Sequence, residues 1–261
     1  MIMSITHRRT FLIALAAAPL FGAGKTKASV IADLGGTIEV SNNLLEGIHR
    51  AGFDGFVQDS PGARLKVQPQ TYSALPLYGL RAGLPRFEDS MDDAAGEVKT
   101  LAELVSVQHG TALILTHAGL SGNGAFRPAD LERKARMLEL AGAICARNGL
   151  TLLYQNQYLE FTGNAAEERA LLVRTDPKSV SYLLDADAAV SVGGDAAAFL
   201  NANAKRVGGM RVADFNAVPA AALAVAIQKT RWSGCMVVPL SAGTIESYKA
   251  ARDRIRSTFG V

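Results

Sequence analysis

The amino-acid sequence predicts an α/β protein that folds as a single (β/α)8 TIM barrel, and three observations support this fold class. The chain has 261 residues, close to the length of about 250 residues that is typical of such a barrel. Short apolar segments alternate with amphipathic segments, as parallel strands alternate with crossover helices. Gly35-Gly36 follows the first apolar segment but no G-x-G-x-x-G motif does, which disfavours an open doubly wound sheet.

The first 28 residues are predicted to be an export signal. They begin with polar and basic residues, continue with an apolar run over residues 11–21 and end in small residues, which is the layout of a cleaved signal peptide. The apolar run is shorter than the roughly 20 residues that span a bilayer. Arg8-Arg9, followed by Phe11, resembles a twin-arginine signal, with His7 where Ser or Thr is usual. An uncleaved anchor or a wrongly assigned start codon is the alternative interpretation.

The sequence therefore divides into a signal peptide over residues 1–28 and one barrel domain over residues 29–261. The domain would be periplasmic or secreted, without a membrane span once the signal is removed. The signal holds four of the 27 Lys and Arg residues and none of the 24 Asp and Glu residues, so the domain keeps 23 basic and 24 acidic residues and a net charge of −1. A nearly neutral domain offers no electrostatic basis for binding nucleic acid. The oligomeric state is left open.

The predicted strands are short apolar segments that end at polar residues. In chain order they cover residues 30–34, 53–58, 78–82, 112–116, 150–155, 180–185, 209–214 and 235–240. Between the second and third strands, residues 61–76 are rich in Pro, Gln and Gly, which predicts a long loop or a broken helix.

The predicted helices have apolar residues at helical spacing and recognisable end signals. In chain order they cover residues 43–51, 91–109, 129–147, 165–173, 195–204, 219–229 and 244–259. The helix over residues 129–147 has the clearest pattern, with Pro128 at its start and Gly149 just past its end. Asp195 and Thr244 are predicted N-caps of the helices that follow them.

Two cysteines fall in elements that a barrel should hold apart. Cys145 lies in a predicted helix and Cys235 in a predicted strand far along the chain. We predict two buried free thiols, with a disulfide formed in an oxidising compartment as the alternative.

Polar residues cluster where the predicted strands end, which is where a (β/α)8 barrel carries its functional site. These residues are Gln58, Asp59, His117, Gln155, Asn156, Gln157, Asp185, Asp187, Arg211 and Asp214. Because side chains alternate in direction along a strand, we expect Gln155 and Gln157 to share one direction. Asp185 and Asp187 should share another for the same reason.

Four segments within residues 110–260 carry a resemblance to a known family. They are YQNQYLEF at residues 154–161, LDA at residues 184–186 with the later Asp195, MRVAD at residues 210–214 and WSGCMVVP at residues 232–239. In order and spacing they are similar to Tyr-His-Asn-His-x-x-Glu-Phe, Leu-Asp-Val with Gly-x-Asp-Pro, Leu-His-x-Lys-Asp and Gly-Trp-x-x-x-Glu. Those motifs belong to the sugar phosphate isomerase/epimerase family, so the resemblance implies its xylose-isomerase-like TIM barrel.

The resemblance also implies a divalent metal ion held by two acids, a His and other polar groups, which assists proton transfer between sugar carbons. Asp185 is the one matching ligand in this sequence. Gln155 and Gln157 replace two His residues, Arg211 replaces a further His and Pro239 replaces a Glu. Gln binds metal weakly and Arg carries only hydrogen-bond donors, so a metal held by Asp185 is disfavoured.

Arg211 suggests a different electrostatic design. Its fixed charge is expected to take the place of the lost ion, pair with Asp185 and bind a carboxylate, phosphate or enolate oxygen. A purely structural ion pair is the alternative. Glu39, Asp59 and Glu88 are candidates for compensating ligands from the first hundred residues.

His117 is a candidate acid or base, because it follows a predicted strand and precedes a Gly/Ser/Asn-rich loop at residues 119–124. A structural hydrogen bond to the backbone is its alternative role. The candidate substrate contacts are Gln155, Asn156, Gln157 and Asp214. Amide groups suit hydroxyl-rich ligands because they both donate and accept, although they could equally bond to one another within the barrel mouth.

Two functions follow from these residues. The first is a sugar isomerase or epimerase that acts on a sugar or related polyhydroxy compound by proton abstraction outside the cytoplasm, with Asp185, His117 and Arg211 as catalytic residues. The second is a non-catalytic carbohydrate-binding barrel derived from such an isomerase. Both imply a small-molecule sugar or polyol as the partner.

Overall fold

The computed structural model describes residues 28–36, 38–60, 74–86, 89–120 and 126–261. The predicted signal peptide up to residue 27, most of the predicted long loop and Glu88 lie outside the described residues.

Eight strands in the described residues are parallel and hydrogen-bonded in chain order, and the last pairs with the first to close a barrel. They are β1 (Val30–Asp33), β2 (Gly55–Asp59), β3 (Leu77–Gly83), β4 (Ala112–Thr116), β5 (Thr151–Gln155), β6 (Ser181–Asp185), β7 (Val207–Arg211) and β8 (Cys235–Pro239). The predicted (β/α)8 barrel is confirmed, and the open sheet is excluded.

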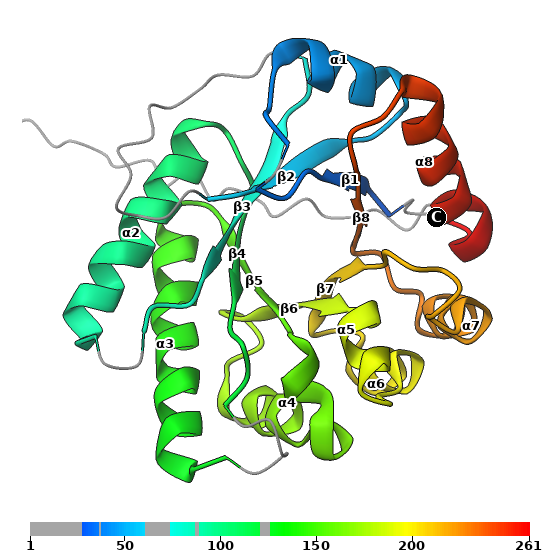
Figure 1. Ribbon diagram of the computed structural model, residues 1–261. Coiled ribbons are helices and arrows are strands. Elements are labelled where there is room, and N and C mark those ends of the chain that lie inside the picture. The colour runs from blue at the N-terminus through cyan, green and yellow to red at the C-terminus, as the bar shows by residue number, and fades with distance from the viewer. Residues whose placement is uncertain (1–27, 37, 61–73, 87–88, 121–125) are drawn as a thin grey trace, which may run out of the picture.

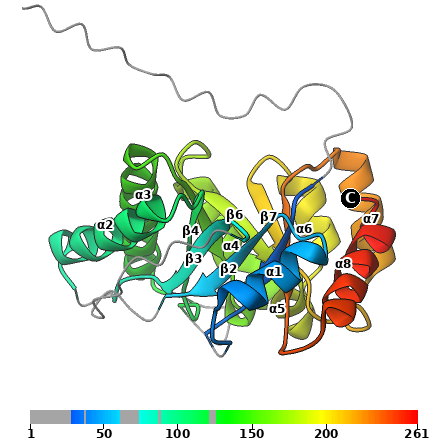
Figure 2. The same cartoon turned by 90° about the horizontal axis from the view of Figure 1, so that it is seen from above.

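Helices surround the ring of strands (Figure 1). They are α1 (Asn42–Arg50), α2 (Met91–Val107), α3 (Pro128–Arg147), α4 (Thr162–Arg174), α5 (Ala186–Ser191), α6 (Ala196–Asn203), α7 (Ala220–Thr230) and α8 (Ile245–Phe259), with a short 3-10 helix η1 (Tyr158–Phe161). In Figures 1 and 2, α2 and α3 lie across the barrel from α7 and α8. None of the helices among the described residues has the length and hydropathy of a membrane span.

The predicted helix end signals are present. Asp195 caps α6 by accepting a hydrogen bond from the Ala198 N–H at 2.9 Å, and Thr244 caps α8 in a capping box with Ser247. Pro128 is the first residue of α3, where its missing N–H costs no helical hydrogen bond. These caps fix where each helix begins after its loop.

The strand residues divide into two apolar clusters. Alternate residues pack outward against the helices in the large core, and the others fill the barrel interior. The interior residues are Ile31, Val57, Ala112, Ile114, Leu153, Leu183, Cys235 and Val237. These interior residues form an apolar floor. On each strand, the next inward-facing residue toward the carboxyl end therefore lies above this floor.

Three local features differ from the sequence prediction. β7 begins at Val207, two residues before the predicted start at Gly209, because Val207 and Gly208 also belong to the strand. A Cβ atom at Gly209 would lie 2.7 Å from Leu183 Cδ1, so the glycine permits close packing of β7 on β6. In α4, residues 163–165 have left-handed backbone angles and the regular helix starts after them. The short helices η1 and α5 were not predicted.

Both cysteines are buried and free. Cys145 lies on α3 and Cys235 in the barrel interior. Burial raises the pKa of the Cys145 thiol to about 12 and that of Cys235 to about 11, so both thiols stay protonated at neutral pH.

Candidate functional site

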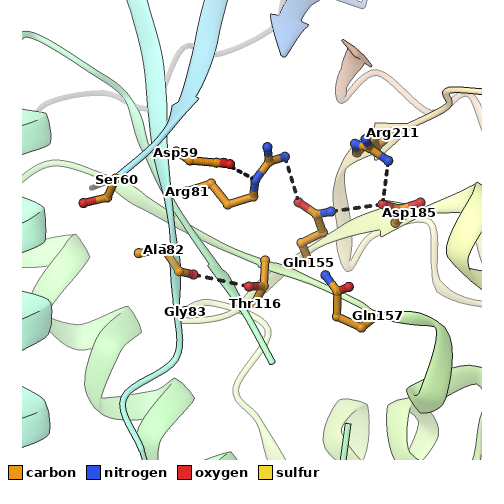
Figure 3. A pocket seen from close by; sticks show the side chains of 10 residues that line it. All are labelled: Asp59, Ser60, Arg81, Ala82, Gly83, Thr116, Gln155, Gln157, Asp185 and Arg211. Atoms are coloured by element: carbon orange, nitrogen blue, oxygen red, sulfur yellow. Dashed lines mark hydrogen bonds and ion pairs between the residues drawn. The ribbon is translucent and has the colours of Figure 1, made fainter. Parts of the chain in front are cut away.

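A pocket of about 440 Å³ opens at the carboxyl ends of the strands (Figure 3). Its lining residues are Asp59, Ser60, Arg81, Ala82, Gly83, Thr116, Gln155, Gln157, Asp185 and Arg211. The volume lies within the range of small-molecule sites, roughly 300–1,000 Å³. This is the end of the barrel where the sequence placed the site.

The polar side chains form one layer because they share a position on their strands. Each lies two residues after an inward-facing apolar residue or glycine, which puts it directly above the apolar floor. The members of this layer are Asp33, Asp59, Arg81, Thr116, Gln155, Asp185 and Arg211. Strand pairing therefore fixes the layer without help from the loops.

Arg81 on β3 joins two of the carboxylates. Its Nη1 and Nη2 atoms each donate to an oxygen of Asp33 at 2.9 Å, which is a bidentate pair. Its Nε donates to Asp59 Oδ1 at 2.7 Å, and its Nη1 also reaches Gln155 Oε1 at 3.4 Å. The Arg81 side chain is only 14% exposed, so these contacts lie largely out of solvent.

Arg211 on β7 closes the network from the other side. Its Nε donates to Asp33 Oδ2 at 3.0 Å and its Nη1 to Asp185 Oδ2 at 2.9 Å. Gln155 Nε2 donates to the same Asp185 oxygen at 3.0 Å. The expected Arg211–Asp185 pair is thus present, and Asp33 is shared by both guanidinium groups.

The network fixes the charge of the site. Burial alone would raise the pKa of Asp33, but Arg81 and Arg211 outweigh it and hold that pKa below its ordinary value. Asp33 is therefore ionised at neutral pH. The three carboxylates Asp33, Asp59 and Asp185 face two guanidinium groups, which leaves a formal charge of −1.

The residues present do not fit a divalent metal ion. Asp185, the one residue that the sequence resemblance matched to a metal ligand, already accepts hydrogen bonds from Arg211 and Gln155 on Oδ2 and from the Ala188 N–H on Oδ1. The described residues contain no group of three or more His, Cys, Asp or Glu side chains arranged to hold a metal. Of the proposed compensating ligands, Asp59 lines the pocket but is bound to Arg81, and Glu39 is exposed and outside it.

The predicted amide contacts have two different environments. Gln155 and Gln157 both line the pocket, as their expected common direction requires. Asn156 is buried behind them, where its side chain accepts from the Asp185 N–H at 2.8 Å and donates to the Asp185 carbonyl at 3.2 Å. Asn156 therefore holds the backbone of Asp185 and does not face the pocket.

Asp187 and Asp214 lie apart from the pocket lining. The expectation that Asp187 shares the direction of Asp185 is wrong, because the strand ends at Asp185 and α5 begins at once. The Asp187 carboxylate instead accepts from the Ala213 and Asp214 N–H groups at 2.6 and 2.7 Å. The Asp214 side chain is exposed and accepts from the Asn216 N–H at 2.8 Å.

His117 follows β4 but is not among the pocket-lining residues. Its Nδ1 accepts a hydrogen bond from the Gly119 N–H at 3.1 Å, which leaves the proton of the neutral ring on Nε2. Burial and the nearby Lys134 charge lower its pKa to about 4. At neutral pH His117 is therefore an uncharged ring that holds the backbone of Gly119 just after β4.

A buried ionic cluster lies behind Gln157. Lys134 on α3 pairs with Glu160 on η1 and with Glu167 on α4, and all three side chains are almost fully buried. Glu160 also accepts from the Tyr154 hydroxyl and, at 2.6 Å, from the Gln157 N–H. The cluster therefore connects the helix layer to a residue that lines the pocket.

Asp33 and Arg81 were missed by the sequence analysis. Both stand two residues after an inward-facing position of a predicted strand, Ile31 and Gly79, as the recognised residues do on their strands. That spacing is the signal that would have found them. The predicted strands run one residue beyond each of them, to Leu34 and Ala82, so neither residue stands at a predicted strand end.

Several solved structures are similar in fold to this chain. A sugar phosphate isomerase/epimerase from Parabacteroides distasonis matches with a TM-score of 0.68 and 14% identity, over 94% of this chain and 98% of that one. The D-allulose 3-epimerase of Methylomonas sp. matches with a TM-score of 0.69 and 11% identity, over 89% of this chain and 98% of that one. A fusion of a xylose isomerase-like TIM barrel with 4-hydroxyphenylpyruvate dioxygenase matches with a TM-score of 0.64 and 16% identity, over 88% of this chain and 42% of that one.

The chain has the xylose isomerase-like barrel fold. No protein-family model matches the sequence, and no curated protein matches it. These likenesses concern the barrel fold. The network of Asp and Arg side chains described above is formed by this chain's own residues.

Proposed function

We propose that the protein acts on a sugar or a related polyhydroxy compound, and that it abstracts a proton from a carbon next to a carbonyl group. The pocket at the barrel mouth carries this proposal, because its lining combines carboxylates, guanidinium groups, two primary amides and hydroxyl groups. Such a mixture of donors and acceptors matches the hydroxyl groups of a polyol. Structural neighbours named as a sugar phosphate isomerase/epimerase, a D-allulose 3-epimerase and an L-ribulose 3-epimerase support the same substrate class.

Arg211 and the two amides have distinct parts in the proposal. Arg211 is 22% exposed and lines the pocket, so its guanidinium can donate to an oxygen that gains negative charge when the proton leaves. Gln155 and Gln157 bind substrate hydroxyls. A metal ion has no part in the proposed reaction, because the carboxylates that would hold it are bound to guanidinium groups.

A non-catalytic carbohydrate-binding barrel is the second candidate. The observation that favours it is the engagement of Asp185, the expected base, whose two oxygens already accept three hydrogen bonds. These three donors occupy most of the acceptor positions of the Asp185 carboxylate, which leaves little room for a substrate C–H group to approach it.

We also propose that the protein works in the periplasm or outside the cell. This rests on the twin-arginine-type pattern of residues 1–28 in the sequence. A free phosphorylated sugar is then a less suitable substrate than a neutral sugar or a sugar acid.

One experiment separates the two functions. The purified protein is screened with aldoses, ketoses and sugar acids by thermal shift and calorimetry, and each ligand that binds is incubated with the protein in D₂O and EDTA. Deuterium at the carbon next to the carbonyl, detected by NMR, is expected of the enzyme, and binding without deuterium incorporation would establish the binding role. Failure of every polyhydroxy compound to bind would contradict both.

The variant Arg211→Met tests the role of Arg211 in the same experiment. It removes the charge and keeps the bulk of the side chain, so we expect loss of deuterium incorporation and weaker binding. If Arg211→Met lowers only the stability and leaves binding and exchange unchanged, then Arg211 forms a structural ion pair.

A further inference from the structure

We propose that Asp59 is the general base of this site, in place of Asp185. The inference rests on the proposed function, because it names the group that would accept the substrate proton. Asp59 lies at the carboxyl end of β2 and lines the same pocket as Arg211.

The other two carboxylates are already engaged. Both oxygens of Asp33 accept from Arg81, and Arg211 and the Gly35 N–H add one hydrogen bond each. Asp185 is bound on both oxygens as well. Their side chains are only 3% and 6% exposed, so a substrate carbon has little access to them.

Asp59 differs from them in both respects. Its side chain is 40% exposed, and Arg81 binds only its Oδ1 atom. Its Oδ2 accepts no hydrogen bond from a residue that the structure describes. One oxygen thus holds the carboxylate in place while the other remains available at the pocket wall, which is the arrangement a general base needs.

The loop after β1 leaves room for this oxygen. A Cβ atom at Gly36 would lie 3.3 Å from Asp59 Oδ2, a closer approach than most side chains tolerate. Gly35, at a φ of 57°, turns the chain beside the same carboxylate. The Gly35-Gly36 pair therefore keeps side-chain atoms away from the oxygen that would accept the proton.

The two reacting groups stand at opposite sides of the pocket. Figure 3 shows Asp59 and Arg211 separated by Arg81 and Gln155. In the proposed step the C–H bond next to the substrate carbonyl breaks and its proton bonds to Asp59 Oδ2. The electron pair moves into the new carbon–carbon double bond, and the carbonyl oxygen becomes an enolate oxygen that accepts a hydrogen bond from Arg211. Return of the proton to carbon regenerates the carboxylate.

The test compares Asp59→Asn with the wild-type protein, using a sugar that the wild type binds and exchanges. Asn keeps an oxygen that can accept from Arg81 but cannot take up the proton, so we expect deuterium exchange to fall by about 10²–10⁴-fold with little change in affinity. Asp92→Asn, an exposed substitution on α2, is the matched control and should exchange at the wild-type rate.

Chemical rescue separates a catalytic role from a structural one. Asp59→Ala leaves a space at the pocket wall, and we expect added formate to restore part of its exchange while sodium chloride at equal ionic strength does not. Wild-type rates in Asp59→Asn, or inactivity of a folded Asp59→Ala in formate, would overturn the assignment of Asp59 while the proposed function stands. Absence of exchange by the wild type with every sugar bound would instead contradict the proposed enzyme, and this inference with it.

Discussion

Asp33, which the sequence did not identify as a site residue, is the carboxylate that binds both guanidinium groups of the site. It binds Arg81 on one side and Arg211 on the other, and so holds both guanidinium groups at the floor of the pocket. These charge-assisted hydrogen bonds hold the two guanidinium groups in fixed positions, and Arg211 still presents its remaining N–H groups to the pocket. Asp59 is held by Arg81 through Oδ1 alone, so its Oδ2 remains available at the pocket wall. The difference between these residues lies in their partners and not in their chemistry.

His117 leads to a prediction of how the stability of the fold depends on pH. Its pKa is about 4 in the folded protein against an ordinary value of 6.5, so the unfolded chain binds a proton at higher pH than the folded chain does. Stability should therefore fall as pH decreases from about 6.5 to about 4, by at most about 1.4 kcal/mol per pH unit from this group. His117→Asn, which keeps an acceptor for the Gly119 N–H and does not titrate, should lose less stability over this range. Urea unfolding at several pH values measures the difference, and identical pH profiles for the two proteins would contradict it.

Among the secondary-structure elements, α3, η1 and α4 act together through the buried cluster. Lys134, Glu160 and Glu167 each come from a different one of these elements, and Glu167 also accepts from the Leu120 N–H at 2.8 Å. Glu168 lies next to them with both oxygens unpaired among the described residues, and burial followed by the charge of Glu160 raises its pKa well above the ordinary value. The raised pKa favours the uncharged form of the Glu168 carboxyl group, which limits the charge inside the cluster.

Removal of Lys134 should destabilise the fold strongly. Lys134→Met leaves the buried carboxylates of Glu160 and Glu167 without their cation, at a cost of about 3–5 kcal/mol in the free energy of unfolding. Lys99→Met is the control, because Lys99 forms an exposed pair with Glu103 and its loss should cost less than about 1 kcal/mol. Urea denaturation gives both values. Equal stabilities of Lys134→Met and Lys99→Met would show that the cluster does not stabilise the fold.

Among helices and strands, the sequence predicted those with a clear periodic pattern well and those without one poorly. The helix over residues 129–147 was predicted to within one residue, since its periodicity and its proline start signal are local features. The start of β7 was predicted two residues late, at Gly209, because Gly208 weakens the strand pattern before it, and only the neighbouring β6 explains why glycine is needed at Gly209. The helix α5 was missed because Asp185 acts both as the last residue of β6 and as its N-cap.

For the molecule as a whole, the charge distribution separates an N-terminal segment from the barrel domain. All four charged residues of the first 28 are basic, whereas the remainder of the chain is close to neutral. A folded barrel with two buried free cysteines requires no disulfide formation after export. Such a protein is compatible with a route that carries folded domains.

Export should depend on the arginine pair. Replacing Arg8 and Arg9 with lysine keeps the positive charge but removes the paired guanidinium groups, so we expect the precursor to accumulate in the cytoplasm of a bacterial host. Lys25→Arg with Lys27→Arg, which also preserves charge, should leave export unchanged. Cell fractionation and immunoblotting measure the distribution, and efficient export of the lysine-pair variant would refute a twin-arginine signal.

The sequence alone determined the order of eight strands and their helices, the end of the barrel that carries the site, and the presence there of Gln155, Gln157, Asp185 and Arg211. These features depend on periodicity and on strand ends, which are local properties of the chain. The pair of Arg211 with Asp185 was expected from the sequence, but only the tertiary structure showed the partners of Asp33. Arg81 reaches Asp33 across 48 residues of sequence, and Arg211 reaches the same carboxylate across 178. Closure of the barrel brings β1, β3 and β7 to one mouth, and side-chain partners there are set by strand register and not by distance along the chain.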